Sequence, residues 1–229
     1  MENPHLKSVE GQKLTTTDIE RLTGSNGPAF LQNCDLQGMD VSQHDLTGWH
    51  FSNCNLMGTS FNGANLEGSV FTGCRAAGVT FLSALLIEAQ ISGGDYSNSS
   101  FRGATLAEIK ISGCKMIGAD LSEAHMMGFD VEDCLFGLAM LPKQSFRKMT
   151  LKRLDFGEAD LQSCDFTETV FEDCSLRDAN LFDCLFENAD LRGADLGGVK
   201  LGDAKQFRGA VISKRQAADL LIQLGLQVH

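Results

Sequence analysis

Every fifth residue from Leu31 to Leu201 is apolar, in an unbroken frame. The frame begins with Leu31, Leu36, Val41, Leu46 and Phe51 and ends with Leu191, Leu196 and Leu201. Side chains on one side of a helix repeat every 3.6 residues, and those on one face of a strand repeat every two. A period of five therefore requires a chain that turns a corner once per repeat. The pattern predicts a solenoid in which each repeat extends one continuous core.

A second period of 20 residues runs through the same region. Phenylalanines in the frame recur at this interval, which would stack their rings between neighbouring layers. Cysteines share one column at multiples of 20: Cys34, Cys54, Cys74, Cys114, Cys134 and Cys174. Four five-residue faces therefore complete one coil. We expect an all-β, four-sided solenoid with about nine coils between residues 29 and 203.

The number and spacing of the cysteines could suggest metal ligands or disulfides, but their positions indicate that the thiols pack in the core. Each one lies two residues before a frame residue, at an inner position that Ala, Ser, Thr or Gly mostly fills elsewhere. A thiol there acts as a small hydrophobic group, and one ligand per layer does not supply the four that zinc requires. We expect no metal site and no disulfide among Cys34, Cys54, Cys74, Cys114, Cys134, Cys164, Cys174 and Cys184.

The two ends of the chain lie outside the repeat. Residues 1–28 are polar, with a short helix expected over residues 17–22 that would cap the first coil. Residues 204–229 should form a helix and tail. There Ser213 and Gln216 form a capping box, an apolar stripe follows, and Gly225 ends the helix.

The stretch near residues 137–154 keeps the frame but fits it badly. Large side chains occupy its inner positions, and Pro142 removes a backbone donor, so we expect a bulge or projecting loop. A basic cluster lies in the same stretch: Lys143, Arg147, Lys148, Lys152 and Arg153. An irregular charged segment on a rigid scaffold is a candidate partner contact. A solvated bulge without function explains it equally well.

The net charge is −11 at pH 7, so direct binding to nucleic acid or to an anionic membrane is not expected. Most of this charge lies in the C-terminal half of the repeat. Its acidic residues form the candidate partner-binding surface: Asp155, Glu158, Asp160, Asp165, Glu168, Glu172, Asp173, Asp178, Asp183, Glu187, Asp190 and Asp195. A protein that binds DNA would meet a body of similar charge and width. The competing interpretation is that the charge only keeps a repeat protein soluble.

Little in the sequence points to catalysis. There are five histidines and no nucleophile motif, phosphate-binding glycine loop or zinc-binding helix motif, and a filled core leaves no internal pocket. We expect a protein that is not an enzyme and uses no cofactor. The N-terminus has no signal-peptide stretch and no segment is long and apolar enough to span a bilayer, so a cytoplasmic location is expected.

Several repeats contain the sequence Ala-Asp/Asn-Leu, as in residues 64–66, 119–121, 159–161, 189–191 and 194–196. This pattern resembles the A(D/N)Lxx motif of pentapeptide repeat proteins, over about three quarters of the chain. The resemblance implies a right-handed quadrilateral β-helix. Within that family, residues 209–228 are similar to the ending of proteins that protect DNA gyrase. That likeness implies a homodimer joined through Leu220, Leu221, Leu224, Leu226 and Val228.

Two functions follow as hypotheses. In the first, a DNA mimic binds DNA gyrase or topoisomerase IV and protects it from quinolones or gyrase-poisoning peptide antibiotics, as the resemblance implies. In the second, the solenoid is a rigid scaffold, adaptor or effector for protein–protein interaction.

Overall fold

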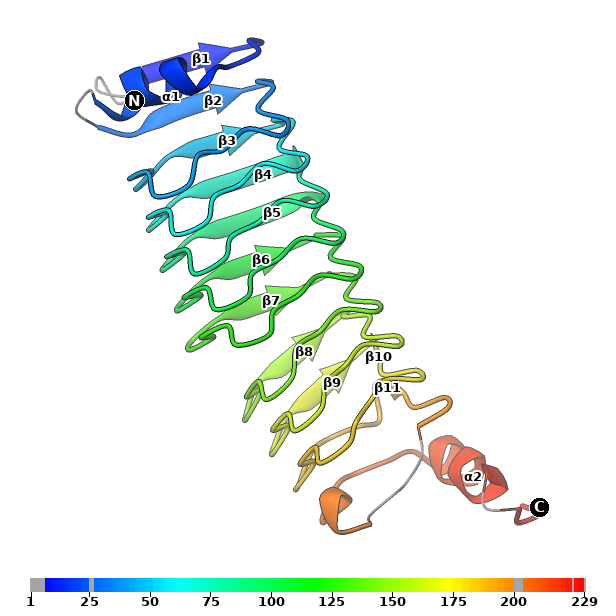
Figure 1. Ribbon diagram of the computed structural model, residues 1–229. Coiled ribbons are helices and arrows are strands. Elements are labelled where there is room, and N and C mark those ends of the chain that lie inside the picture. The colour runs from blue at the N-terminus through cyan, green and yellow to red at the C-terminus, as the bar shows by residue number, and fades with distance from the viewer. Residues whose placement is uncertain (1–6, 25–26, 200–203, 224, 229) are drawn as a thin grey trace, which may run out of the picture. The chain divides into compact units, whose positions relative to one another are not determined.

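The computed structural model describes residues 7–24, 27–199, 204–223 and 225–228. The last expected frame residue, Leu201, and one expected dimer residue, Leu224, lie outside the described residues. The chain divides into two compact units, Met1–Cys134 and Leu135–His229. Both are built from the same kind of coil, and the fold is a right-handed parallel β-helix of about nine coils with a short C-terminal helix (Figure 1).

In the first unit, seven strands pair in parallel in chain order (Figure 1). From β2 onward, each residue pairs with the residue 20 positions later, for example Phe51 with Phe71, which confirms the predicted coil length. A helix, α1 (Thr16–Thr23), follows the first strand. The strands are β1 (Lys7–Glu10), β2 (Ala29–Gln32), β3 (His50–Ser52), β4 (Val70–Arg75), β5 (Gln90–Asp95), β6 (Lys110–Ser112) and β7 (Asp130–Glu132).

The sequence pattern did not predict strand β1, because its residues are mostly polar. It pairs with β2 and so completes the edge of the first coil. Helix α1 confirms the expected N-terminal helix. Its N-cap, Thr15, and Asp18 form a reciprocal capping box, and Ile19 and Leu22 are buried.

The second unit contains two parallel strand pairs, β8 with β9 and β10 with β11. Its elements are β8 (Thr150–Lys152), β9 (Val170–Glu172), β10 (Cys174–Ser175), β11 (Ala194–Asp195), the 3-10 helix η1 (Ala204–Phe207) and α2 (Lys214–Gln223). The frame slips by one residue at the C-terminal end, because Asp190 bridges to Val211 rather than to residue 210. Phe207 still stacks on Phe186, with ring centroids 4.9 Å apart.

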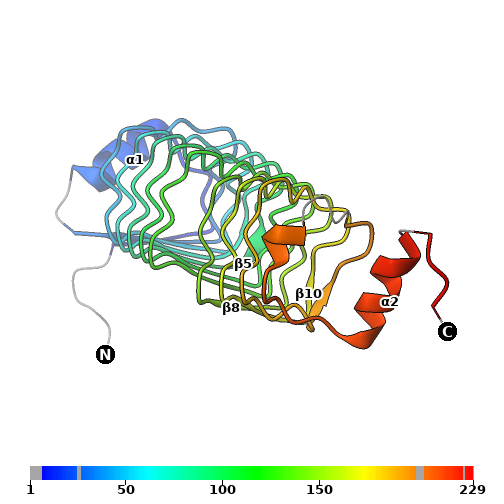
Figure 2. The same ribbon diagram turned by 90° about the horizontal axis from the view of Figure 1, so that it is seen from below.

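Each coil has four faces, which we name after their central frame residues in one coil of the second unit. Face 1 is centred on Leu151, face 2 on Phe156, face 3 on Leu161 and face 4 on Phe166, and the residues 20 positions away belong to the same face. Figure 2 shows that the coils enclose a core. Nearly all described frame side chains are buried. Two residues after each frame residue the chain turns a corner, and there φ is close to +60° at most coils.

The interior is close-packed by ladders of like side chains. Phe146 and Phe166 stack with centroids 4.9 Å apart, and Phe61 and Phe81 with centroids 5.2 Å apart. All eight cysteines are buried and free, as the packing interpretation predicts. Burial raises the pKa of the Cys184 thiol to about 12, so it stays protonated at neutral pH.

The prediction of a bulge or loop near residues 137–154 is wrong. Met140 bridges to Asp160 and Ser145 to Asp165, with the same 20-residue register as elsewhere. Pro142 fits because it directly follows a frame residue, and the backbone N–H at that position takes no part in the ladder of the regular coils. The large inner side chain of Leu154 is 1% exposed, so the core accommodates it without an opening.

Candidate partner-binding surface

The C-terminal helix closes the last coil through one side chain. Ser213 and Gln216 form the predicted capping box: Ser213 N donates to Gln216 Oε1 at 2.7 Å, and Gln216 N donates to Ser213 Oγ at 3.2 Å. Gln216 Nε2 also donates to the carbonyls of Leu191 and Ala194, both at 2.7 Å. In an earlier coil the equivalent carbonyl, Leu154 O, accepts from the backbone of the next coil. Gln216 therefore supplies donors to carbonyls of the last coil, as the backbone of a following coil does at Leu154.

The basic cluster belongs to a regular coil, and the acidic coil beside it neutralises much of its charge. Arg147 pairs with Asp165 at 3.2 Å and Lys148 with Glu168 at 3.8 Å. Lys152 pairs with Glu172 at 3.8 Å. Each of these residues lies 18 or 20 positions before its partner. This spacing matches the predicted 20-residue coil, but the sequence does not show which exposed side chains of neighbouring coils reach one another. Lys143 and Arg153 are exposed at corners of the same coil.

Two further carboxylates are held by arginines near the C-terminal end. Asp190 lies against Arg192, with oxygen and nitrogen 2.6 Å apart, and this hydrogen bond holds the pKa of Asp190 below its ordinary value. Arg177 pairs with Asp195 at 2.8 Å. The pKa of Asp195 is lowered by the backbone N–H of Gly197 and, in addition, by Arg177.

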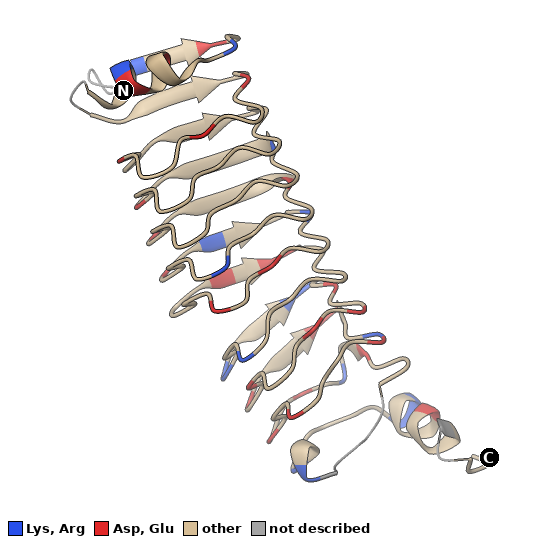
Figure 3. Ribbon diagram, in the orientation of Figure 1, with Lys and Arg blue, Asp and Glu red and all other residues tan. Residues whose placement is uncertain are grey.

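Corner residues distinguish the second unit from the first. Many corners of the first unit are glycine, the residue that adopts positive φ at least cost. The second unit places other residues at positive φ: Leu138, Lys143, Lys148, Arg153, Glu158, Ser163, Glu168, Asp173, Asp178, Asp183 and Asn188. Corners project from the coil, and the charged side chains among these therefore carry their charge outward. Figure 3 shows acidic and basic segments at the corners of these coils.

The remaining predicted acidic residues lie in the same coils and are not held by an ion pair between described residues. Asp155 Oδ1 accepts from Gly157 N at 2.9 Å, and Asp160 Oδ1 accepts from Asn180 Nδ2 at 2.9 Å. The others are exposed: Glu158, Asp173, Asp178, Asp183 and Glu187. The predicted acidic surface thus separates into carboxylates that neighbouring coils neutralise and carboxylates that face solvent.

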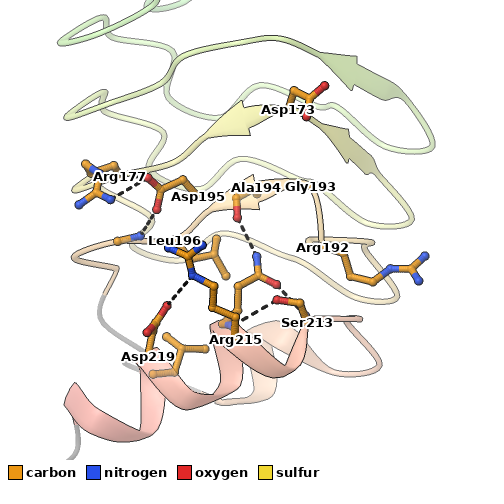
Figure 4. A pocket seen from close by; sticks show the side chains of 13 residues that line it. Asp173, Arg177, Arg192, Gly193, Ala194, Asp195, Leu196, Ser213, Arg215 and Asp219 are labelled. Carbon is orange, nitrogen blue, oxygen red and sulfur yellow. Dashed lines mark hydrogen bonds and ion pairs between the residues drawn. The ribbon is translucent and has the colours of Figure 1, made fainter.

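An open pocket of about 590 Å³ lies between α2 and the last coil (Figure 4). Its charged lining is balanced: Asp173, Arg177, Arg192, Asp195, Arg215 and Asp219. Arg177 is already paired with Asp195 and Arg215 with Asp219, the latter at 4.0 Å. The pocket therefore offers no excess of charge to a small ion. No group of His, Cys, Asp and Glu in the described ranges has the arrangement of a metal site.

The predicted dimer residues divide into two groups. Leu220 is 8% exposed and lines an apolar cavity with Leu196 and Phe207, so the protomer itself uses this side chain. Leu221, Leu226 and Val228 are exposed. Leu220 is therefore not part of the exposed apolar surface of the C-terminus, although the family resemblance implied that it is a dimer contact. Among the described helices, none is long and apolar enough to cross a membrane.

These features define a class of protein: a parallel β-solenoid with a filled core and a charged outer surface. Family models give the particular family. The model described as pentapeptide repeat region matches residues 44–121, and the model described as pentapeptide repeats matches residues 155–181 and 171–205. Together they match more than half of the chain, which belongs to the pentapeptide repeat family.

Solved structures of QnrB1 share this fold. A trypsin-treated variant of QnrB1, a plasmid-mediated fluoroquinolone resistance protein, is 24% identical with a TM-score of 0.59, over 85% of this chain and 98% of that chain. Full-length QnrB1 is 22% identical with a TM-score of 0.52, over 97% and 99%. HetL, a pentapeptide repeat protein from the cyanobacterium Nostoc, is 17% identical with a TM-score of 0.43, over 83% and 87%. No curated protein matches the chain significantly in sequence.

Proposed function

We propose that this pentapeptide repeat protein is a non-catalytic DNA mimic of the cytoplasm that binds a type II topoisomerase, DNA gyrase or topoisomerase IV. The bound protein protects the enzyme from quinolones or gyrase-poisoning peptide antibiotics. The observation that carries the proposal is the solvent-facing charge of the second unit. Between residues 155 and 195, two turns of the solenoid, Arg177 and Arg192 are the only bases against the acidic residues described above.

The charge density supports mimicry of a duplex. Coils of a β-solenoid stack at roughly 4.8 Å, so these two turns span roughly 10 Å of axis. Duplex DNA carries one negative charge per roughly 1.7 Å. The net charge per ångström along these turns is at least as high as that of DNA. A DNA-binding enzyme would therefore meet a rigid surface of comparable charge.

QnrB1 supplies a precedent for the biological role in the same fold, since it is described as a fluoroquinolone resistance protein. At 24% identity the likeness establishes the fold, and the role of this chain is the part that we propose. The proposal includes a homodimer joined by the exposed apolar residues of the C-terminus, Leu221, Leu226 and Val228. Two acidic units would then be presented together.

Supercoiling and cleavage assays with purified gyrase test the proposal. We expect protein at micromolar concentration to relieve quinolone-stabilised DNA cleavage, or to change the rate of supercoiling. The same assays with topoisomerase IV decide between the two enzymes. Unchanged cleavage and supercoiling with both enzymes would refute the DNA-mimic function and favour the scaffold or adaptor hypothesis. For the dimer, Leu221→Asp should give monomers by light scattering, and an unchanged dimer mass would refute this interface.

A further inference from the structure

The solvent-facing carboxylates of the second unit are not spread evenly over its four faces. The described ion pairs of its coils lie on face 1, on face 2, on face 4 and at the corner between faces 4 and 1. Face 3 and its two corners carry Glu158, Asp160, Asp178 and Asp183, and none of these pairs with a described basic residue. The base among the described residues of these columns is Lys143, at the corner between faces 3 and 4, so the four carboxylates leave an excess of acidic charge that no described ion pair neutralises.

The same face exposes large apolar side chains. Phe182, which directly follows the frame residue Leu181, is 61% exposed, whereas the frame phenylalanines of the coils, such as Phe166 and Phe186, are buried. Leu138, at the corner between faces 2 and 3, is 58% exposed, and Met140, on face 3, is 41% exposed. Pro142 lies in the same column as Phe182, two coils earlier. Apolar groups and unpaired carboxylates therefore share one surface, which spans three coils or roughly 10 Å along the axis.

The backbone that carries these groups is held in place. Phe182 N donates to Asn180 Oδ1 at 3.2 Å, and Phe182 O accepts from Ser163 N at 2.8 Å. Asn180 in turn donates to Asp160 at 2.9 Å. The surface is thus preorganised, which lowers the entropy cost of binding to it.

We propose that face 3 of the second unit is the docking face for the partner protein, and that the partner presents basic side chains around an apolar patch. Charge complementarity selects this partner, since the carboxylates can pair with its cations without breaking internal ion pairs. Phe182 is the central apolar anchor. Aromatic residues contribute much of the binding energy at other protein interfaces. The assignment rests on the proposed function, because it names the face through which that function is exerted.

Matched variants test this face with reconstituted DNA gyrase as the probe, by biolayer interferometry at about 0.15 M salt. The triple variant Glu158→Asn, Asp178→Asn and Asp183→Asn removes three charges from face 3 corners, and asparagine tolerates the positive φ of these positions. The control variant Glu168→Asn, Asp173→Asn and Glu187→Gln removes three charges from other parts of the same coils. The two variants therefore have the same net charge.

We expect the face 3 triple variant to bind roughly 10-fold more weakly than the wild type, and the control to bind within about threefold of it. Phe182→Ser should weaken binding roughly 10-fold, whereas Met127→Ser, at an apolar residue of the first unit that is even more exposed, should leave it unchanged. Circular dichroism verifies that each variant is folded. Equal losses for the two triple variants, with no effect of Phe182→Ser, would refute the face assignment while gyrase binding itself stands. Absence of wild-type binding would overturn the proposed function, and the face assignment with it.

Discussion

Replacing Gln216 with glutamate separates the two roles that this side chain has in the structure. A glutamate keeps the carboxyl oxygen that accepts from Ser213 N, and glutamate is the usual partner in a capping box. It loses the Nε2 amide that donates to Leu191 O and Ala194 O, both at 2.7 Å. An oxygen of the carboxylate would then face two carbonyl oxygens at the end of the core.

The two roles predict opposite signs. As a helix cap alone, the change from Gln to Glu should be neutral or stabilise α2 by a few tenths of a kcal/mol through the helix dipole. If Gln216 closes the last coil, the change to Glu removes two hydrogen bonds of about 1 kcal/mol each and leaves half-buried carbonyl acceptors without donors. We expect a net loss of about 2 to 4 kcal/mol in the local stability of the C-terminal cap.

Native-state hydrogen exchange measures this loss where it occurs, since the coils of a solenoid can open separately. Gln216→Glu should speed exchange of the protected amides in α2 and in residues 191–199 by about 30-fold or more. Ser213→Ala, which removes only the helix cap, is the control and should cost about 1 kcal/mol, or about fivefold. Protection in Gln216→Glu equal to or greater than that of the wild type would refute the idea that Gln216 closes the coil.

Three other results are expected. Gly94→Ala should destabilise the first unit by about 3 kcal/mol in urea unfolding, because φ is +100° there and a Cβ would meet the Cys74 carbonyl; an unchanged midpoint would contradict this. The buried thiols, including Cys184 with its raised pKa, should resist a thiol reagent at pH 8 in the folded protein and react in guanidinium; fast native labelling would be the contrary result. Asp190 and Asp195 have folded pKa values below the ordinary 3.8, so their stabilisation is present above about pH 4 and is lost as pH falls through the folded values. Urea midpoints from pH 7 to pH 2.5 should drop below pH 4, less so in Asp190→Asn, and a flat profile would count against these pairs.

The five-residue frame and the 20-residue column were enough to predict the core. Leu154 and Pro142 show where this reasoning failed. A large residue at an inner position suggested an opening, and a proline suggested a break, yet both occur in a regular coil. A sequence shows which residue types are unusual at a position, but whether neighbouring layers leave room for them depends on packing in three dimensions.

The candidate site was predicted in composition but not in arrangement. The acidic half and the basic cluster were both visible in the sequence, where Lys148 and Glu168 are one predicted coil apart but were treated as separate surfaces. The coil places them 3.8 Å apart, so much of the basic cluster is neutralised from within. Packing of α2 against the last coil buries Leu220, which the family resemblance had implied to be a dimer contact.

The sequence by itself determined the coil length and the inward side chains, because every repeat restates the same local geometry, and it determined the end helices, because capping residues and apolar stripes are local signals. Only the tertiary structure decided which charges cancel, because the 20-residue period places columns side by side but does not fix which side chains come within reach of each other. The folded chain leaves face 3 of the second unit with its carboxylates unpaired and Phe182 in solvent.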